Sequence, residues 1–160
     1  MSDVLTKIKT QFENAILEIH SSFGDDTAVI NKEKLVEVAR FLKEDSELDF
    51  NVLMDLTAVD YLSLEKPWRF EVVYHFYSLA KNHRVRIKVP VTEEDAEVAT
   101  LTSLWPIADW FEREVWDMFG IQFKGHPHLK RILMYEGFVG YPLRKDYPVN
   151  KRQPLIGPKN

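Results

Sequence analysis

The stretch RFEVVYHFYSLAKNHRVRIKVPV, from Arg69 to Val91, decides the fold. Apolar residues alternate with other residues on both sides of the connection SLAKNH, which is the pattern of two strands that each bury one face. The residues predicted on the buried faces are Phe70, Val72, Tyr74 and Phe76 in the first strand, and Val85, Ile87, Val89 and Val91 in the second. The sequence therefore predicts a β-hairpin at the centre of the chain.

Helical spacing of apolar residues predicts two helices before this hairpin. The first ends at Gly24, and the second runs from a cap at Asn31 to about Glu44. A short strand over Thr27–Asn31 separates them. The predicted buried stripes are Leu5, Ile8, Phe12, Ala15, Ile16 and Ile19 in the first helix, and Leu35, Val38, Ala39 and Leu42 in the second.

Three further segments flank the hairpin. In FNVLMDLTAVDYL (Phe50–Leu62) the first apolar residues are three apart and indicate a turn of helix, and the second half is typical of a strand. Thr92 is followed by three carboxylates, which oppose the helix dipole, so a helix is predicted that ends before Pro106. A last helix is expected over roughly Ile107–Phe119, with Gly120 as its stop.

This order of elements predicts an α+β fold: a two-layer domain with a mixed, largely antiparallel sheet packed against helices, followed by an extended C-terminal arm. Residues 1–120 contain 13 Lys/Arg and 23 Asp/Glu, whereas residues 121–160 contain 8 Lys/Arg and 2 Asp/Glu. The last 40 residues also hold 9 of the 14 glycines and prolines. We therefore divide the chain into an α+β domain, residues 1–133, and a basic docking arm, residues 134–160.

Composition excludes several classes of site. The chain has no cysteine, so disulfides, thiolate zinc sites, cysteine-ligated iron–sulfur clusters and cysteine nucleophiles are ruled out. The N-terminus lacks the apolar region of a signal peptide, and no stretch approaches the roughly 20 apolar residues that span a bilayer. We expect a soluble chain made in the cytoplasm that reaches a membrane only through a partner.

The run FEREVWDMFGIQFKGHPHLKRIL, from Phe111 to Leu133, is the densest in charged and aromatic residues. On the predicted helix, Glu114 and Asp117 are three apart, and Arg113 and Asp117 are four apart. Such spacing is typical of pairs on a helix surface, and it favours that interpretation over a carboxylate pair for acid–base catalysis. The stripe expected to face the core is Ile107, Phe111, Val115, Met118 and Phe119.

His126 and His128 could supply two imidazoles to a metal, but a catalytic zinc site needs a third protein ligand, and none is nearby in the sequence. A stand-alone metal-dependent hydrolase using His126 and nearby carboxylates is therefore a weaker alternative. No glycine-rich run has the spacing of a phosphate or dinucleotide loop. Nucleic-acid binding by the basic arm is a further alternative, which the acidic body disfavours.

The segments EREVWDMFGIQFKGHPHLKRIL and GYPLRKDYP (Gly140–Pro148) resemble the signature of the C subunit of the proton-pumping NADH:quinone oxidoreductase, respiratory complex I. The likeness extends from about residue 29 to 148, with departures at His128 and Gly137. The matching residues, which the resemblance assigns to the family signature and its interfaces, are Glu112, Arg113, Glu114, Asp117, Phe119, Gly120, Phe123, Gly125, His126, Pro127, Leu129, Arg131, Leu133, Gly140, Pro142, Leu143, Arg144, Lys145 and Asp146.

The resemblance implies a non-catalytic structural or assembly subunit of the peripheral arm, at the cytoplasmic face of a bacterial inner membrane. It implies no catalytic residue, no metal and no cofactor in this chain, because NADH, FMN, the iron–sulfur clusters and quinone belong to other subunits. The expected partner is chiefly the large quinone-site subunit, with no nucleic acid bound. NADH-to-quinone electron transfer and proton translocation would be activities of the whole complex. Accessory subunits of membrane-bound hydrogenase or formate hydrogenlyase complexes resemble this family and remain an alternative.

Within this resemblance we expect the charged residues of the last helix, Glu112 to Asp117, to orient the arm through charge-assisted hydrogen bonds. Gly120 should end the helix with a positive φ, and Gly125 and Pro127 should shape the following turn. From Gly137 onward the arm should be held weakly by its own domain. The residues expected to anchor it on a partner are Phe138, Tyr141, Arg144, Lys145 and Tyr147.

Overall fold

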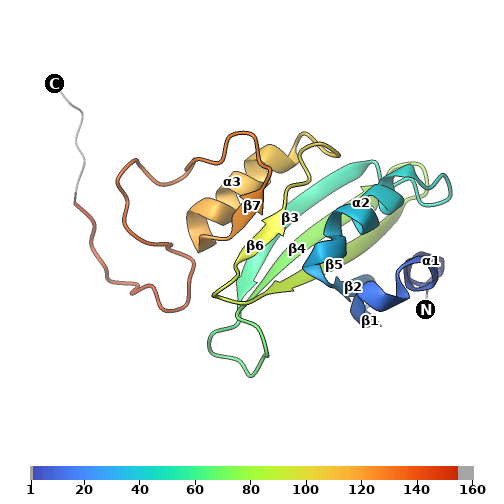
Figure 1. Ribbon diagram of the computed structural model, residues 1–160, viewed down its shortest axis with the longest axis horizontal. Coiled ribbons are helices and arrows are strands. Elements are labelled where there is room, and N and C mark those ends of the chain that lie inside the picture. The colour runs from blue at the N-terminus through green and yellow to red at the C-terminus, as the bar shows by residue number, and fades with distance from the viewer. Residues whose placement is uncertain (1, 155–160) are drawn as a thin grey trace.

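The computed structural model describes residues 2–154, so Met1 and the last part of the predicted arm, residues 155–160, lie outside the described residues. A five-stranded sheet carries its helices on one face (Figure 1). The elements, in chain order, are α1 (Asp3–Gln11), a 3-10 turn (Glu13–Ala15), β1 (Ile16–Ser22), β2 (Asp25–Ile30), a 3-10 turn (Lys32–Lys34), α2 (Leu35–Glu44), β3 (Val52–Asp60), β4 (Phe70–Ser78), β5 (His83–Val91), β6 (Glu97–Ala99), α3 (Ala108–Phe119) and β7 (Gln122–Lys124).

The predicted hairpin forms the middle of the sheet, whose strand order is β1-β2-β5-β4-β3. Strands β4 and β5 pair antiparallel, with Tyr74 opposite Ile87 and Val72 opposite Val89. Strand β2 joins β5 in parallel, so the sheet is mixed. The predicted α+β class with a largely antiparallel sheet is confirmed.

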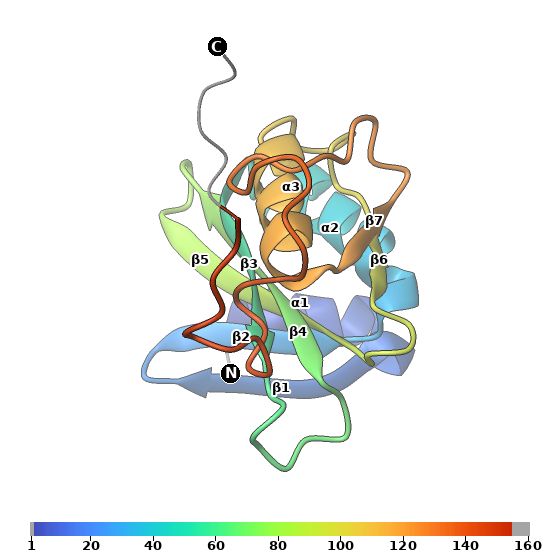
Figure 2. The same cartoon turned by 90° about the vertical axis from the view of Figure 1, so that its left-hand side faces the viewer.

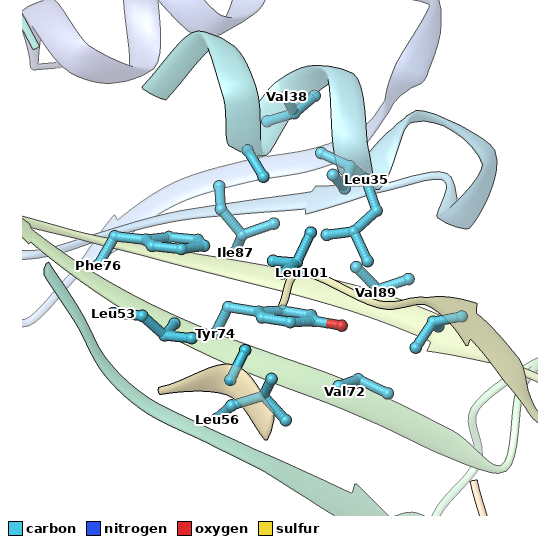
Figure 3. Close-up of a cluster of buried hydrophobic side chains, with 14 of the residues drawn as sticks. Leu35, Val38, Leu53, Leu56, Val72, Tyr74, Phe76, Ile87, Val89 and Leu101 are labelled. Carbon is cyan, nitrogen blue, oxygen red and sulfur yellow. The ribbon is translucent and has the colours of Figure 1, made fainter. Parts of the chain in front are cut away.

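The core lies between the sheet and the helices. The predicted faces of β4, β5 and α2 are all buried in it. Figure 3 shows Tyr74 in this cluster, with Leu35 and Val38 of α2 on the helical side. The ring of Phe76 packs on Trp105, with 4.8 Å between ring centroids.

Two predictions of helical structure were wrong for the same reason. The first helix ends at Gln11, and Ile16–Ser22 forms β1, while Phe50–Leu56 contains no helix and Val52–Asp60 is one continuous strand. Each strand has a β-bulge that changes the pairing register: between Ile16 and Glu18 in β1, and between Leu53 and Asp55 in β3. A bulge inserts one residue and shifts the alternation, so apolar residues three apart reach the same face. Gly24 lies in the β1–β2 turn with φ +83°.

The helix predicted after Thr92 is also absent from the described structure. Instead, Asp95 N–H donates to the Thr92 hydroxyl in a local turn, and β6 pairs in parallel with β7. This pairing joins segments about 25 residues apart, and local sequence signals do not report it. Val98, Leu101, Leu104 and Trp105, from β6 and the connection that follows it, are buried in the core.

The last predicted helix is confirmed as α3, and Gly120 ends it with φ +76°. Beyond β7, residues 125–154 contain neither helix nor strand. Figure 2 shows this segment passing across α3. Among residues 2–154, none of the helices has both the length and the apolar character needed to cross a bilayer.

Candidate functional site

A stripe of three charged residues on α3, spaced four apart, holds the chain that follows β7. Asp109, Arg113 and Asp117 face residues 126–134, which run alongside the helix in the same direction. The Asp109 carbonyl lies 3.2 Å from His126 Nε2, and Arg113 Nε donates to the Lys130 carbonyl at 3.1 Å. Asp117 then accepts the backbone N–H groups of residues 132–134. One face of the helix therefore acts as a template for an extended chain.

Asp117 makes the densest set of contacts in this stripe. Its carboxylate is fully buried, and Oδ2 accepts three backbone N–H groups, from Ile132 at 3.1 Å, Leu133 at 2.8 Å and Met134 at 2.9 Å. Oδ1 accepts Arg131 Nη1 at 2.6 Å. Burial by itself would raise the pKa of Asp117, but these N–H groups and the Arg131 guanidinium outweigh it and hold that pKa below its usual value.

We call these hydrogen bonds around Asp117 the Asp117 clamp. Arg131 extends this clamp into the C-terminal segment. Its Nη2 donates to the Gly140 carbonyl at 3.3 Å. The guanidinium carbon lies 5.7–5.8 Å from the ring centroids of Trp116, Phe138 and Tyr141, which is within the range of cation–π attraction. Phe138 in turn packs edge-on against Tyr135. The helix, the arginine and the aromatic residues of the segment therefore form one cluster.

A second clamp holds residues 144–146 against the sheet. The buried carboxylate of Asp60, at the end of β3, accepts Arg69 Nη2 at 3.1 Å and the Lys145 backbone N–H at 2.8 Å. Arg69 Nη2 also donates to Asp146 at 2.8 Å, and its Nη1 donates to Glu93 at 2.6 Å. The bond from Arg69 lowers the pKa of Asp146. Three carboxylates thus surround one arginine whose side chain is 8% exposed.

Gly120 and Arg144 join the two clamps. Arg144 Nε donates to the Phe119 carbonyl at 2.6 Å, and the Leu143 N–H donates to the Met118 carbonyl at 3.1 Å. These bonds satisfy carbonyls at the end of α3, where no further helical turn can do so. A Cβ on Gly120 would lie 2.6 Å from the Tyr141 ring and 2.9 Å from Arg144 Nη2. Gly120 therefore supplies both the left-handed conformation and the space for this approach.

Glu112 faces the connection between β6 and α3, and its Oε2 also lies 4.0 Å from His126 Nε2. It is fully buried, and it accepts the Leu101 N–H at 2.7 Å and the Thr100 hydroxyl. Burial raises the pKa of Glu112 to about 7, against the lowering effect of these two hydrogen bonds, and the nearby charge of Asp109 raises it further. Glu112 therefore fixes the start of α3 rather than the C-terminal segment.

His126 contacts backbone groups through both ring nitrogens. Nδ1 accepts the His128 N–H at 3.0 Å, so Nε2 carries the hydrogen that it donates to the Asp109 carbonyl. Its side chain is buried, and residues 2–154 contain no group of three or more His, Cys, Asp and Glu positioned to hold a metal. The arrangement gives His126 a structural position.

The structure corrects several expectations about this helix. Arg113 and Asp117 were predicted to form a surface pair, but both are buried, and Arg113 pairs with Asp109 at 3.7 Å. Glu114 is exposed, and Ile107, predicted on the core face, is 47% exposed. The apolar stripe was assigned to the core from hydrophobicity alone. Hydrophobicity does not identify a charged residue that can be buried because its side chain is hydrogen-bonded to backbone N–H or carbonyl groups.

The expected weak anchoring from Gly137 onward differs from the contacts found, because residues 140–146 bond to Arg131, Asp60 and Arg69.

Sequence reasoning did not find Asp60, Arg69 or Thr100. Asp60 and Arg69 flank the β3–β4 connection and meet only because β3 and β4 pair, so no local motif marks them. An aspartate and an arginine at the two ends of a predicted hairpin connection would have been the available signal.

The fold and the contacts define a small α+β domain that holds an extended C-terminal segment on buried acidic residues and arginines. Residues 28–153 match the family described as the 30 kDa subunit of respiratory-chain NADH dehydrogenase. The chain belongs to this family.

Relatives in sequence and structure agree with this assignment. The C subunit of NADH-quinone oxidoreductase from Citrifermentans bemidjiense is 47% identical over 155 residues, covering 96% of this chain and 94% of the relative. The corresponding C subunit from Geobacter sulfurreducens is 44% identical over 153 residues, covering 94% and 93%.

Two solved structures are also similar. A trypsin-resistant fragment of Nqo5, residues 1–134 of that protein, has a TM-score of 0.69 and 34% identity, and the match covers 79% of this chain and 99% of the fragment. A chain of a membrane-bound sulfane sulfur reductase, an archaeal respiratory membrane complex, has a TM-score of 0.75. It is 24% identical, with 92% of this chain and 85% of that chain covered, and it shares the fold.

The Asp117 clamp predicts a large effect of Asp117→Asn. The amide would leave Arg131 without its anion and turn an NH₂ group toward a donor, so we expect a loss of about 3 kcal/mol in the free energy of unfolding in urea at pH 7. Because the folded-state pKa of Asp117 is lowered, its stabilisation is present above the unfolded value near 3.9 and is lost as pH falls through the folded pKa. The free energy of unfolding of the variant should therefore fall less than that of the unaltered chain as the pH is lowered. The control is Glu114→Gln, on the exposed face of the same helix; an equal effect of the two changes would contradict the clamp.

Gly120→Ala should destabilise the chain more than Gly24→Ala. Both glycines have positive φ, but a Cβ at Gly24 meets nothing within 4 Å, whereas one at Gly120 meets Tyr141 and Arg144. Backbone strain should cost each variant about 1 kcal/mol, and displacement of Tyr141 should add about 1–3 kcal/mol at Gly120 alone. Urea unfolding of both variants measures the difference. Equal losses would show that Tyr141 does not rest on the end of α3.

Proposed function

We propose that this chain is the C subunit of a respiratory complex I, a proton-translocating NADH:quinone oxidoreductase, and that its role there is structural and non-catalytic. The family match and the names of the relatives support the complex. They also favour it over a hydrogenase or formate hydrogenlyase assembly. In this proposal NADH, FMN, iron–sulfur clusters and quinone are bound by other subunits, and the chain attaches peripherally at the cytoplasmic face of a bacterial inner membrane.

The C-terminal segment is the docking element in this proposal, with the large quinone-site subunit as its main partner. The observation that carries it is that the buried carboxylates of Asp117 and Asp60 accept hydrogen bonds from the backbone of this part of the chain. Apolar side chains of the segment are thereby left exposed to solvent. Exposed apolar residues recur along it, at Val139, Leu143 and Val149, and Leu133 is exposed directly before it. A segment fixed in shape before it binds loses less conformational entropy on association.

Charge supports the same surface. Residues 121–160 carry 8 Lys/Arg and 2 Asp/Glu, and Lys130, Lys145 and Lys151 are exposed. A partner surface that is apolar with an acidic rim fits this combination, since charge complementarity speeds and orients association. In this proposal the chain divides into a body, residues 1–133, and a docking segment, residues 134–160.

The signature residues take two roles in the proposal. Asp117, Arg131 and Arg144 shape the segment through bonds within the chain, and the exposed side chains of the segment contact the partner. Leu143 is half-exposed while its backbone is bonded to Met118. It is therefore held in place and available for contact, which makes it a suitable position for a test.

The docking surface is tested by the double change Val139→Asp and Leu143→Asp in a tagged chain that replaces the native copy in its own cells. Loss of two apolar contacts of about 1 kcal/mol each should reduce the co-purified partner subunits roughly thirtyfold. NADH:quinone activity of the membranes should fall in proportion. The isolated chain should unfold at nearly the same urea concentration, because both side chains are exposed.

The matched control is Phe23→Asp, at the β1–β2 turn, where the side chain is fully exposed and distant in the chain from the docking segment. This variant should co-purify the same partners as the unaltered chain. Full assembly of the Val139/Leu143 variant would contradict the docking surface while leaving the family assignment intact. NADH oxidation by the isolated chain would contradict the non-catalytic role.

A further inference from the structure

Glu112 is a buried carboxyl group at a junction of four parts of the fold. It belongs to α3, and it faces the connection after β6, the turn after β7 and strand β4. Thr100 and Leu101 donate hydrogen bonds to it from the first of these. His126 Nε2 lies 4.0 Å from Oε2 on the second. Tyr74, on β4, is close enough for the charge of Glu112 to add to the effect of burial in raising the pKa of its phenol.

No lysine or arginine among residues 2–154 forms an ion pair with this carboxylate. The nearby His126 ring directs its two nitrogens to the His128 N–H and the Asp109 carbonyl. Asp109 adds a second negative charge nearby. An unpaired buried carboxylate is costly, so burial favours the protonated form and raises the pKa of Glu112 to about 7.

A pair of hydroxyl groups leads from Glu112 toward the surface. Thr100 Oγ1 is hydrogen-bonded to Glu112 Oε2 and lies 3.0 Å from Thr102 Oγ1, and Thr102 is partly exposed. The Thr100 hydroxyl has one hydrogen, so it donates either to Glu112 or to Thr102. When Glu112 is ionised, Thr100 donates inward; when Glu112 is protonated, Glu112 donates to Thr100 and Thr100 donates outward.

We propose that Glu112 is a reversible proton-binding site, and that the hydroxyl groups of Thr100 and Thr102 carry the proton between this site and the solvent. On uptake, a solvent proton joins Thr102 Oγ1, the Thr102 hydrogen passes to Thr100, and the Thr100 hydrogen passes to Glu112 Oε2. Each threonine gains one hydrogen and gives up one, so the chain as a whole gains one proton. All hydrogen bonds along the path then point outward.

Proton binding here is linked to folding. Because the folded-state pKa of Glu112 is raised above its unfolded value, the folded state is favoured most below the unfolded value, near 4.3, and that advantage is lost as pH rises through neutrality. Glu112 fixes the start of α3 through Thr100 and Leu101. Its protonation therefore sets the hydrogen bonding of the β6–α3 connection at neutral pH.

The test is a pH titration of the purified full chain followed by the side-chain carboxyl ¹³C signal of Glu112, assigned by its loss in Glu112→Gln. We expect a midpoint near pH 7 for Glu112 in the folded chain. Thr100→Val removes a hydrogen bond to the charged form and should raise the Glu112 midpoint by about one pH unit.

Thr102→Val tests the proton path separately from the pKa of Glu112. It leaves the Thr100–Glu112 bond in place, so the midpoint should stay within about 0.3 units. Exchange between the two forms, measured from line shapes near the midpoint, should slow by about tenfold or more because the hydroxyl path is broken. Exchange at the unaltered rate in Thr102→Val would overturn the pathway. A Glu112 midpoint near 4.3 would overturn the site itself.

Discussion

The capture of three consecutive backbone N–H groups by the buried carboxylate of Asp117 is the interaction on which the C-terminal third of the structure depends. A segment without helix or strand satisfies only part of its own backbone groups through turns, and it buries little apolar surface. Asp117 supplies the acceptors that a neighbouring strand would otherwise provide. Arg131 completes the set, and its guanidinium gathers the aromatic residues of the segment around α3.

The rest of the segment follows from that first attachment. Once Arg131 fixes Gly140, Tyr141 can lie over Gly120, and Arg144 can reach the end of α3. Asp60 and Arg69 then hold residues 145 and 146 from the sheet side. The signature segment is rich in charge because its charged groups replace regular secondary structure. In the proposed assembly, this leaves the apolar side chains of the segment free to contact a partner.

Much of the body could be predicted from sequence because its signals are local. Alternation predicted the hairpin from Phe70 to Val91, and helical spacing predicted α2 and α3. The failures have definite causes. In β1 and β3, bulges placed Ile16 with Ile19 and Leu53 with Leu56 on one face, which imitates a helix. The β6–β7 pairing depends on contacts between distant segments, and helix propensity after Thr92 did not outweigh them.

The candidate site was recognisable by its resemblance to a family, but its geometry was not. Hydrophobicity places Arg113 and Asp117 on a surface, and only the path of residues 126–134 shows why they are buried. Glu112 illustrates the same limit. Its pKa is raised by burial and by the charge of Asp109, against the hydrogen bonds from Leu101 and Thr100, and the spacing of carboxylates along the helix carries no information about that environment.

The central claim is that buried carboxylates fix the docking segment before any partner binds. Amide hydrogen exchange of the isolated chain in dilute solution tests it most directly, at Leu133 and Met134 on Asp117 and at Lys145 on Asp60. The account predicts that these three amides exchange about a hundredfold or more slowly than in an unfolded peptide, and that Asp117→Asn removes the protection at Leu133 and Met134. Exchange of all three at unfolded rates in the unaltered chain would contradict it.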